Sequence, residues 1–389
     1  MTKNVTNGRI ANELSSQFIW SAFKYYLKKE GDSLILYSPI KYWKSQHLIN
    51  MEFKEGYLLN RKFFHASESA ISLIWWKNSE KARELNHITL KPIMLLAQEN
   101  YTSFPLEDVI VKKVFNNLNF YFDPKEQRDK ENYIAMLNLS GYNLDSASGR
   151  LMRRLEDLKG HGTKKLLYRE NFFEKLPLFA AKKYTHTHWK EKDVIYTTSD
   201  GKNKYLKDIK FLRNCAFWVA MSDKNEIFSS KIQNKILQNE LTFSNVLIDE
   251  ERIGHYITEM DKYFNEYKFS TEENKILKQF LKIHKILKSP EFVLQLNEIS
   301  KCNEILNYDK ELVYGVAQIN KQFNLNYKRD ELGNKIYKEC NKELFNLIKN
   351  KTFKMNDILN TELNKLNKMV SKYYDIYIVS KLFEYELLK

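Results

Sequence analysis

The chain has 389 residues, 43% of them hydrophobic and 29% charged, which is typical of a soluble globular protein with two or three domains. Lys and Arg outnumber Asp and Glu by 63 to 49, and such an excess favours polyanionic partners, nucleic acid first; codon bias toward lysine would produce it without any function. No apolar run reaches the roughly 18 residues of a membrane span, no signal peptide follows Met1, and the cysteines are too scattered for a zinc site. These features predict a cytoplasmic protein without a membrane partner.

Residues 10–76 follow the order helix, strand, helix, strand, strand. Apolar residues recur at helical spacing from Ile10 to Ala22, and Gly31 ends that helix. The short apolar run Ser33–Tyr37 stops at a Ser-Pro pair, which predicts a buried parallel strand. We expect a second short helix and two further strands at residues 42–51, 56–60 and 69–76.

Several segments of this stretch form a larger pattern. They are the helical Phe18-Ile-Trp-Ser-Ala-Phe23, Gly31, the strand Leu34-Ile-Leu-Tyr-Ser-Pro39, then Phe63-Phe64-His65 and Ser69-Ala-Ile-Ser-Leu-Ile74. The pattern resembles the end of the catalytic domain in adenine-specific (N6) DNA methyltransferases, especially the large restriction–modification enzymes of type IIG. The resemblance implies a partial Rossmann-like methyltransferase domain that is followed by a target-recognition region.

The resemblance also implies a role for two aromatic residues. In the family, the Phe before the last strand packs against the adenine that is rotated out of the duplex, and by position this residue is Phe64, with Phe63 as the second choice. An aromatic face restores about 1–3 kcal/mol of lost stacking per base. The alternative is that both residues are core residues that flank a strand.

The chain departs from the family where the cofactor and the chemistry are concerned. The family has a glycine-rich loop for S-adenosylmethionine and an Asn/Asp-Pro-Pro-Tyr/Phe tetrapeptide that accepts hydrogen bonds from the adenine amino group. Here the six prolines are all isolated, and no Gly-x-Gly-x-x-Gly occurs. We therefore expect no catalytic, cofactor-binding or metal-binding residue in this chain, and S-adenosylmethionine on an amino-terminal methyltransferase subunit or missing half.

Basic residues are concentrated in the next region. Between a predicted strand at residues 133–140 and Glu170, seven of them occur within twenty residues: Arg150, Arg153, Arg154, Lys159, Lys164, Lys165 and Arg169. Interleaved with glycines and Tyr168, they suit contacts to DNA phosphates, which set affinity and register but not sequence choice. The alternative is a solvated helix face with ion pairs. A further strand is expected within residues 87–96, and residues 109–122 form an amphipathic, aromatic stretch.

A second stretch, residues 176–201, contains a Leu-Pro-Leu start, a Trp and a Thr-Thr-Ser-Asp-Gly end, and the predicted helix at Phe211–Cys215 follows it. This stretch resembles the target-recognition part of the type IIG-like methylases. Residues 194–198 favour a strand. His186 and His188 could be read as a metal pair, but exposed histidines beside a Trp are the better interpretation.

The last region is predicted to be helical. Apolar residues at heptad-like spacing among Lys and Glu indicate helices at residues 253–264, 273–287, 310–323, 332–348 and 359–388. Such a region is typical of a scaffold, a partner surface or a cradle for the DNA backbone.

The expected fold is thus an α/β partial Rossmann-like domain (residues 1–83), an α+β recognition region (84–245) and a mostly α-helical carboxy-terminal region (246–389). The expected function is double-stranded DNA binding and target recognition for an adenine-specific methyltransferase, inactive without an amino-terminal partner. One alternative is a Mg²⁺-dependent nuclease, for which Lys190-Glu191-Lys192-Asp193 would have to supply ligands from adjacent strands. The other is a non-enzymatic helical interaction protein.

Overall fold

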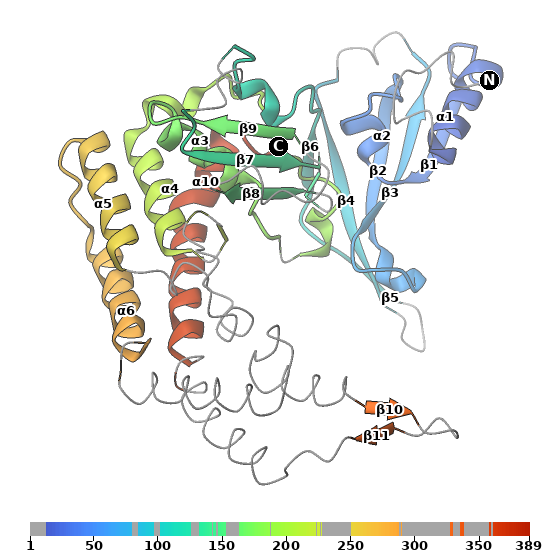
Figure 1. Ribbon diagram of the computed structural model, residues 1–389. Helices are drawn as coiled ribbons and strands as arrows, with labels where there is room; N and C mark the ends of the chain where they lie inside the picture. The colour runs from blue at the N-terminus through green and yellow to red at the C-terminus, as the bar shows by residue number, and fades with distance from the viewer. Residues whose placement is uncertain are drawn as a thin grey trace.

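The protein is described by a computed structural model (Figure 1). The described residues are 13–79, 85–96, 102–125, 132–152 without 142, 145 and 146, 163–227 without 187, 223 and 226, 250–287, 289, 327–329, 335–337, 358 and 361–389. Within them, a mixed sheet, a small antiparallel sheet and a layer of helices follow one another along the chain.

The first sheet has the strand order β1-β3-β2-β4-β5, and β6 pairs with the other half of β4. Its β3 runs antiparallel to both neighbours while β2 and β4 are parallel, so β1, β2 and β4 all point in one direction. The sheet continues past residue 83, because β4–β6 belong to it. The strands are β1 (Ser33–Ser38), β2 (Glu52–Asn60), β3 (Ala70–Lys77), β4 (His87–Leu96), β5 (Thr102–Pro105) and β6 (Val109–Lys112).

Alternation of side chains explains why this sheet has one buried face. In β3, Ser72, Ile74 and Trp76 are buried, while Trp75 between them is exposed. The helices α1 (Leu14–Tyr25) and α2 (Lys41–Lys44) accompany the sheet, and Ile19, Tyr42 and Trp43 from them belong to the same core. The expected strands at residues 56–60, 69–76 and 87–96 are confirmed.

Two predictions for this sheet are wrong. The strand at Ser33–Tyr37 is neither parallel to its neighbour nor buried: β3 lies between β1 and β2, and Ile35 and Tyr37 are exposed. The helix expected at residues 42–51 has only the four residues of α2, and His47, with φ 53°, has a left-handed backbone that a helix cannot continue through.

The second sheet has β7 (Ala135–Ser140) at its centre, with β8 (Ser148–Met152) and β9 (Thr163–Leu167) antiparallel on either side. One face contributes Leu137 and Leu151 to the main core, against α3 (Phe172–Ala181). The other face holds a separate small cluster of Met136, Met152 and Leu166.

Helices dominate the rest of the described chain. They are α4 (Ile209–Met221), α5 (Glu250–Phe264), α6 (Thr271–Leu287), residues 361–374, and the continuation of the latter through a π-helical turn (Asp375–Val379) into α10 (Ser380–Glu384). A helical carboxy-terminal region was expected, and α5, α6 and the last helix confirm it. The helix expected at residues 310–323 lies outside the described residues.

One of the expected helices contains a strand instead. Within residues 332–348, β11 (Lys335–Tyr337) pairs antiparallel with β10 (Tyr327–Arg329). The physical reason is local: Gly333-Asn334 is a turn sequence, and short β-prone segments with tyrosine lie on both sides of it.

The carboxy-terminal residues are hydrogen-bonded both to residues 196–198 and to α2. Tyr196 and Lys389 exchange two backbone hydrogen bonds of 2.9 Å, and the Thr198 N–H donates to the Leu387 carbonyl at 2.9 Å. The ammonium of Lys44 in α2 donates to the Lys389 carbonyl at 2.7 Å, and burial lowers the pKa of this ammonium well below its usual value. The expected strand at residues 194–198 is present only as isolated β-bridges at Tyr196 and Thr197. The first sheet and the helices contribute to one hydrophobic core.

No helix among the described residues is long and apolar enough to cross a membrane.

Candidate functional site

The two predicted base-stacking residues lie at the carboxyl edge of the first sheet. Because β1 and β2 point the same way, both end at this edge, and the 3₁₀ helix η3 (Arg61–Phe64) follows β2 directly. Phe64 is 46% exposed, and its ring meets Tyr37 edge-on at 5.8 Å between centroids. The half-buried Phe63 packs edge-on against Phe64 at 5.1 Å. We call Tyr37, Phe63 and Phe64 the edge aromatics.

This position is chemically informative. In open, mostly parallel α/β sheets, ligands bind outside the carboxyl ends of the strands; this sheet is mixed, and among its described strands only β2 and β4 pair in parallel. The alternative that Phe64 is a core residue is wrong, since almost half of its surface is exposed. The sequence pointed to Phe63 and Phe64 but not to Tyr37; the run Ser-Leu-Ile-Leu-Tyr has no alternation of polar and apolar residues that would mark its exposed face.

A cation lies beside the edge aromatics. The Arg61 guanidinium donates to the Ser69 hydroxyl at 3.2 Å, which holds it at the start of β3. Partial burial raises the pKa of the Tyr37 phenol, and the positive charge of Arg61 opposes that rise. Lys62 is exposed on the same turn, and His65 ends it with a left-handed backbone of φ 58°. This corner thus combines aromatic faces with positive charge.

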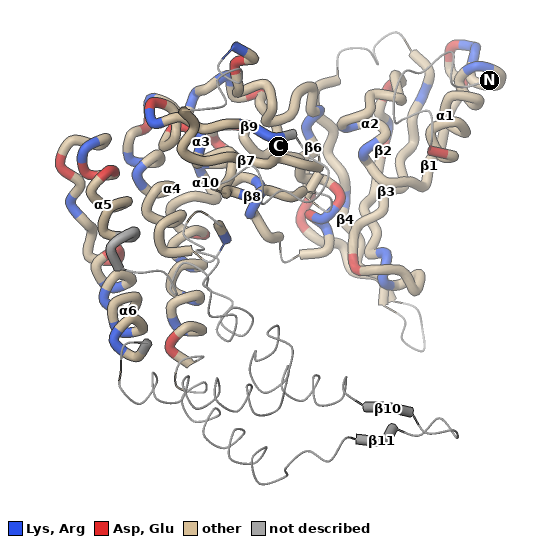
Figure 2. The backbone as a smooth tube through the Cα atoms, in the orientation of Figure 1, with Lys and Arg blue, Asp and Glu red and all other residues tan. Residues whose placement is uncertain are grey.

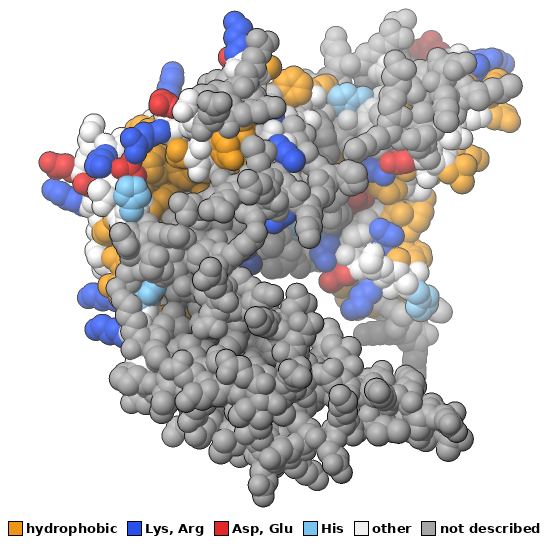
Figure 3. Space-filling model, in the orientation of Figure 1, with side chains coloured by type: hydrophobic (Ala, Val, Ile, Leu, Met, Phe, Trp, Pro, Cys, Tyr) orange, Lys and Arg blue, Asp and Glu red, His pale blue; other side chains and the backbone are white. Residues whose placement is uncertain are grey.

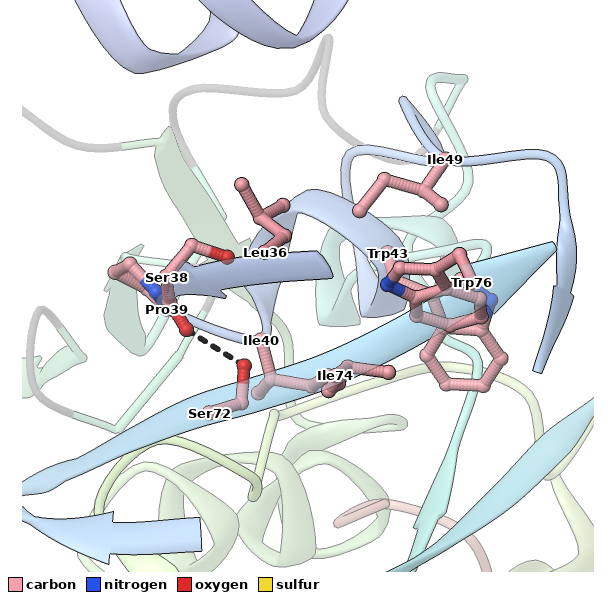
Figure 4. Close-up of a pocket in the computed structure, with 9 residues that line it drawn as sticks. All are labelled: Leu36, Ser38, Pro39, Ile40, Trp43, Ile49, Ser72, Ile74 and Trp76. Carbon is pink, nitrogen blue, oxygen red and sulfur yellow. Dashed lines mark hydrogen bonds between the residues drawn. The ribbon is translucent and has the colours of Figure 1, made fainter. Parts of the chain in front are cut away.

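The hollow behind the end of β1 is filled by the protein itself. It is lined by apolar side chains with Ser38 and Ser72, and the Ser72 hydroxyl donates to the Ser38 carbonyl at 2.6 Å (Figure 4). The indole rings of Trp43 and Trp76 are 5.9 Å apart within it. It leaves no room for a water molecule, so a ligand at this edge would lie on the exposed side, against the edge aromatics.

Two of the predicted phosphate-binding residues are brought together by the second sheet. Arg150 of β8 and Lys164 of β9 are both opposite Asn138 of β7, so the three residues form a row across the sheet on one face. Lys164 is exposed and Arg150 half-buried. This row is the basic part of the candidate nucleic-acid interface.

The other predicted residues lie elsewhere. Lys165 is on the opposite face of β9, where its ammonium lies 5.4 Å above the Phe122 ring and burial lowers its pKa. The Arg169 guanidinium is exposed and lies 3.6 Å from the Glu259 carboxylate of α5. The remaining three, Arg153, Arg154 and Lys159, lie outside the described residues. The alternative of a single helix face is wrong for the described residues. Arg150 lies on β8, Lys164 and Lys165 lie on β9, and Arg169 follows β9.

The strand arrangement required for a nuclease is not present around Lys190–Asp193. Glu191 ends the 3₁₀ helix η8 (Trp189–Glu191), and the buried Asp193 carboxylate accepts the Ile40 N–H at 3.3 Å. The His188 ring caps the same helix by accepting the Lys190 N–H at 3.3 Å. Among the residues that the structure describes, no three His, Cys, Asp or Glu side chains are grouped to hold a metal ion.

Sequence reasoning missed a pocket of about 390 Å³ between β6, residues 184–195 and the carboxy-terminal segment. Its aromatic wall is Tyr184 against Phe383, with ring centroids 5.7 Å apart. The Tyr184 hydroxyl donates to Glu191 at 3.4 Å, and burial together with that carboxylate raises the pKa of the phenol to about 12. No local motif predicts this pocket, because three segments distant in sequence form it. It exposes both ammonium and carboxylate groups, so charge alone selects no class of ligand.

Basic residues occur in all parts of the described chain and are not confined to one stripe (Figure 2). No family model, no curated protein and no solved structure matches the chain.

Proposed function

We propose that this chain is the DNA-binding, target-recognition portion of an adenine-specific DNA methyltransferase of a restriction–modification system. The observation that carries the proposal is the position of Phe64: its ring is 46% exposed, contacts Tyr37 edge-on, and lies on the 3₁₀ helix that follows the carboxyl end of β2. A base that leaves the duplex loses its stacking, and an aromatic face compensates for part of that loss.

The row of Arg150 and Lys164 supports the second half of the proposal. Side chains that project from one face of a sheet can follow a phosphate backbone; in this row Lys164 is exposed and Arg150 half-buried, while Asn138 between them is buried. The row supplies affinity and register, while the edge aromatics receive the base.

Methyl transfer needs groups that this sequence lacks. S-adenosylmethionine and the tetrapeptide would belong to an amino-terminal subunit, so the chain alone should bind DNA without methylating it. Methylation of DNA by the purified chain with S-adenosylmethionine would contradict this division of labour.

The test of the base-stacking role is a fluorescence-anisotropy titration at low salt with two duplexes, one fully paired and one with a single unpaired adenine. Phe64→Ala should remove about 1–3 kcal/mol of the preference for the unpaired adenine, which is about 5- to 150-fold in Kd. Phe120→Ala is the matched control, because Phe120 is also an exposed phenylalanine but lies on another element, η5 (Leu118–Tyr121). If the two variants keep the same preference for the duplex with the unpaired adenine, the role of Phe64 is wrong. If the wild type binds neither duplex, the whole proposal is wrong.

A further inference from the structure

Strand β6 has a free edge along the pocket that it forms with residues 184–195 and the carboxy-terminal segment. The Lys113 N–H donates to the Asn86 carbonyl at 2.8 Å, and in an antiparallel pair every second residue bonds to the partner strand. The backbone groups of Ile110 and Lys112 therefore point away from β4, and both residues line the pocket. In the part of the chain that the structure describes, neither has a hydrogen bond on that side, so two N–H donors and two C=O acceptors are open to a ligand.

The same edge is covered one step further along the chain. Val114 follows Ile110 and Lys112 in the alternation, and its N–H donates to the Lys44 carbonyl at 2.9 Å. Its carbonyl accepts a hydrogen bond from the His47 ring at 2.8 Å. The protein thus satisfies this edge where α2 reaches it and leaves it open along the wall of the pocket.

The charged side chains along this edge are ordered. Glu107 and Asp108 come directly before β6, Lys112 is its last residue, and Ile110, 63% exposed, lies between them. All four line the pocket, and among the described residues none of the three charged side chains has an ion pair. An extended chain from Asp108 to Lys112 spans about 13 Å, the length of a peptide of three or four residues.

The other charges of the pocket are paired or balanced. The Lys389 ammonium lies 2.8 Å from the Asp200 carboxylate, and the Glu386 carboxylate has an ion pair of 3.0 Å. Lys190 and Glu191, adjacent on η8, add one charge of each sign. On the face of the molecule that Figure 3 draws, acidic and basic side chains are likewise interspersed over the described surface. Opposite charges at the two ends of a short strand suit a ligand that carries an ammonium at one end and a carboxylate at the other.

We propose that this pocket binds a short peptide with free termini, which adds to β6 as a parallel strand. The ammonium of the peptide lies against Asp108 and its carboxylate against Lys112, so the peptide runs in the same direction as β6. Its backbone pairs with Ile110 and Lys112, and its apolar side chains contact the wall of Tyr184 and Phe383. An internal segment of a protein, a second copy of this chain included, lacks the two terminal charges. The site shares no residue with the edge aromatics, so it is independent of the proposed DNA binding.

The first experiment is a calorimetric titration of the full chain with three free tripeptides, trialanine, Ala-Leu-Ala and Ala-Phe-Ala, at millimolar concentration. We expect binding, and we expect acetylation of the amino end or amidation of the carboxyl end to weaken it by about tenfold each, since each removes one charged contact. Binding of none of the three peptides would overturn the proposal. Free leucine that binds as tightly as Ala-Leu-Ala would replace the peptide by a single amino acid.

Two variants assign the ends of the peptide. Glu107→Gln with Asp108→Asn should remove the effect of acetylation and keep that of amidation, and Lys112→Gln should do the reverse. Glu272→Gln on α6 and Lys210→Gln on α4 are matched removals of a surface charge, and they should change neither effect. The exchanged result, in which Lys112→Gln removes the effect of acetylation, would reject the parallel direction. Unchanged binding in every variant would reject the site.

Residue-resolved hydrogen exchange tests the strand pairing itself. The peptide should slow exchange at the amides of Ile110 and Lys112 and leave those of Val109 and Val111, which already face β4, nearly unchanged. Binding without this alternation would contradict the added strand. Slowing at the same amides that rises with protein concentration in the absence of peptide would identify a second copy as the occupant and overturn the proposal.

Discussion

At the scale of single residues, Gly149 is required by close packing. A Cβ atom at this position of β8 would lie 2.6 Å from the Cβ atom of Lys182, just after α3. The Lys182 ammonium in turn donates to the carbonyls of Ser140 and Gly141, so the strand and the helix end are joined by both packing and hydrogen bonds. The position of the Arg150 and Lys164 row depends on this contact, because Gly149 precedes Arg150 directly.

Gly149→Ala should destabilise the protein by about 1–3 kcal/mol, since the inserted methyl group must displace the root of a buried side chain. Gly254→Ala is the control, because no atom lies within 4 Å of a Cβ at that position of α5, and alanine there should stabilise the helix by about 0.5–1 kcal/mol. Urea unfolding of both variants measures the difference. Equal stability of the two variants would show that the close contact at Gly149 is relieved at no cost.

Lys182 also predicts a pH dependence. Burial lowers the pKa of its ammonium from 10.5 to about 8. Between these values the unfolded chain binds the proton that the folded chain has released, so the contribution of Lys182 to stability rises with pH from about 8 to 10.5. The stability of the wild type relative to Lys182→Met should therefore increase between pH 7.5 and pH 10, by on the order of 1–3 kcal/mol. Urea unfolding of both proteins at the two pH values tests this, and a constant difference would contradict it.

At the scale of elements, one carboxylate connects the helical layer. Glu273 near the start of α6 accepts the Tyr267 hydroxyl at 2.7 Å, the Tyr373 hydroxyl of the last helix at 2.8 Å and the Ser270 N–H at 2.7 Å. Ser270 accepts the Glu273 N–H in return at 3.2 Å, which completes a capping box. Burial and this carboxylate raise the pKa of both tyrosines.

Glu273→Ala should cost about 2–5 kcal/mol of unfolding free energy, because two buried hydroxyls and a helix-terminal N–H lose their acceptor. Glu272→Ala, one residue away, removes only a surface pair with Lys275 at 3.5 Å, and it should change stability by less than about 0.5 kcal/mol. Chemical unfolding followed by circular dichroism distinguishes the two variants. Similar costs for both would contradict a central role of the buried carboxylate.

The second sheet makes a separate prediction about DNA. The double variant Arg150→Ala with Lys164→Ala should weaken binding to any sequence and lower the slope of log K against log salt by about 2, because each phosphate contact releases about one counterion. Lys207→Ala with Lys210→Ala removes the same charge from exposed lysines of another region, and its slope should stay close to that of the wild type. Equal slopes for both double variants would mean that Arg150 and Lys164 contact DNA phosphates no more than other exposed lysines do.

At the scale of the whole molecule, the carboxy-terminal segment holds the first sheet against the helices. Leu387 and Leu388 are fully buried, and the carbonyl of Lys389 accepts both the Tyr196 N–H and the Lys44 ammonium. Leu388→Ala should therefore cost about 2–5 kcal/mol. Hydrogen exchange should rise at α2 as well as near Tyr196. An increase confined to residues 380–389 would show that the segment is only a local cap.

The sequence by itself determined the elements whose cause is local. Helical spacing placed α5, α6 and the last helix, and short apolar runs placed β2, β3, β4 and β7, because these periods depend only on which face of an element is buried. It also drew attention to Phe64 and to Arg150 and Lys164, although as separate features. Pairing between distant segments decided the rest: β3 enters between β1 and β2 and leaves Ile35 of β1 exposed, and the pairing of β7 with β8 and β9 brings Arg150 and Lys164 to one face of the second sheet. Local patterns specify the faces of an element, whereas the tertiary structure decides which neighbour, if any, covers each face.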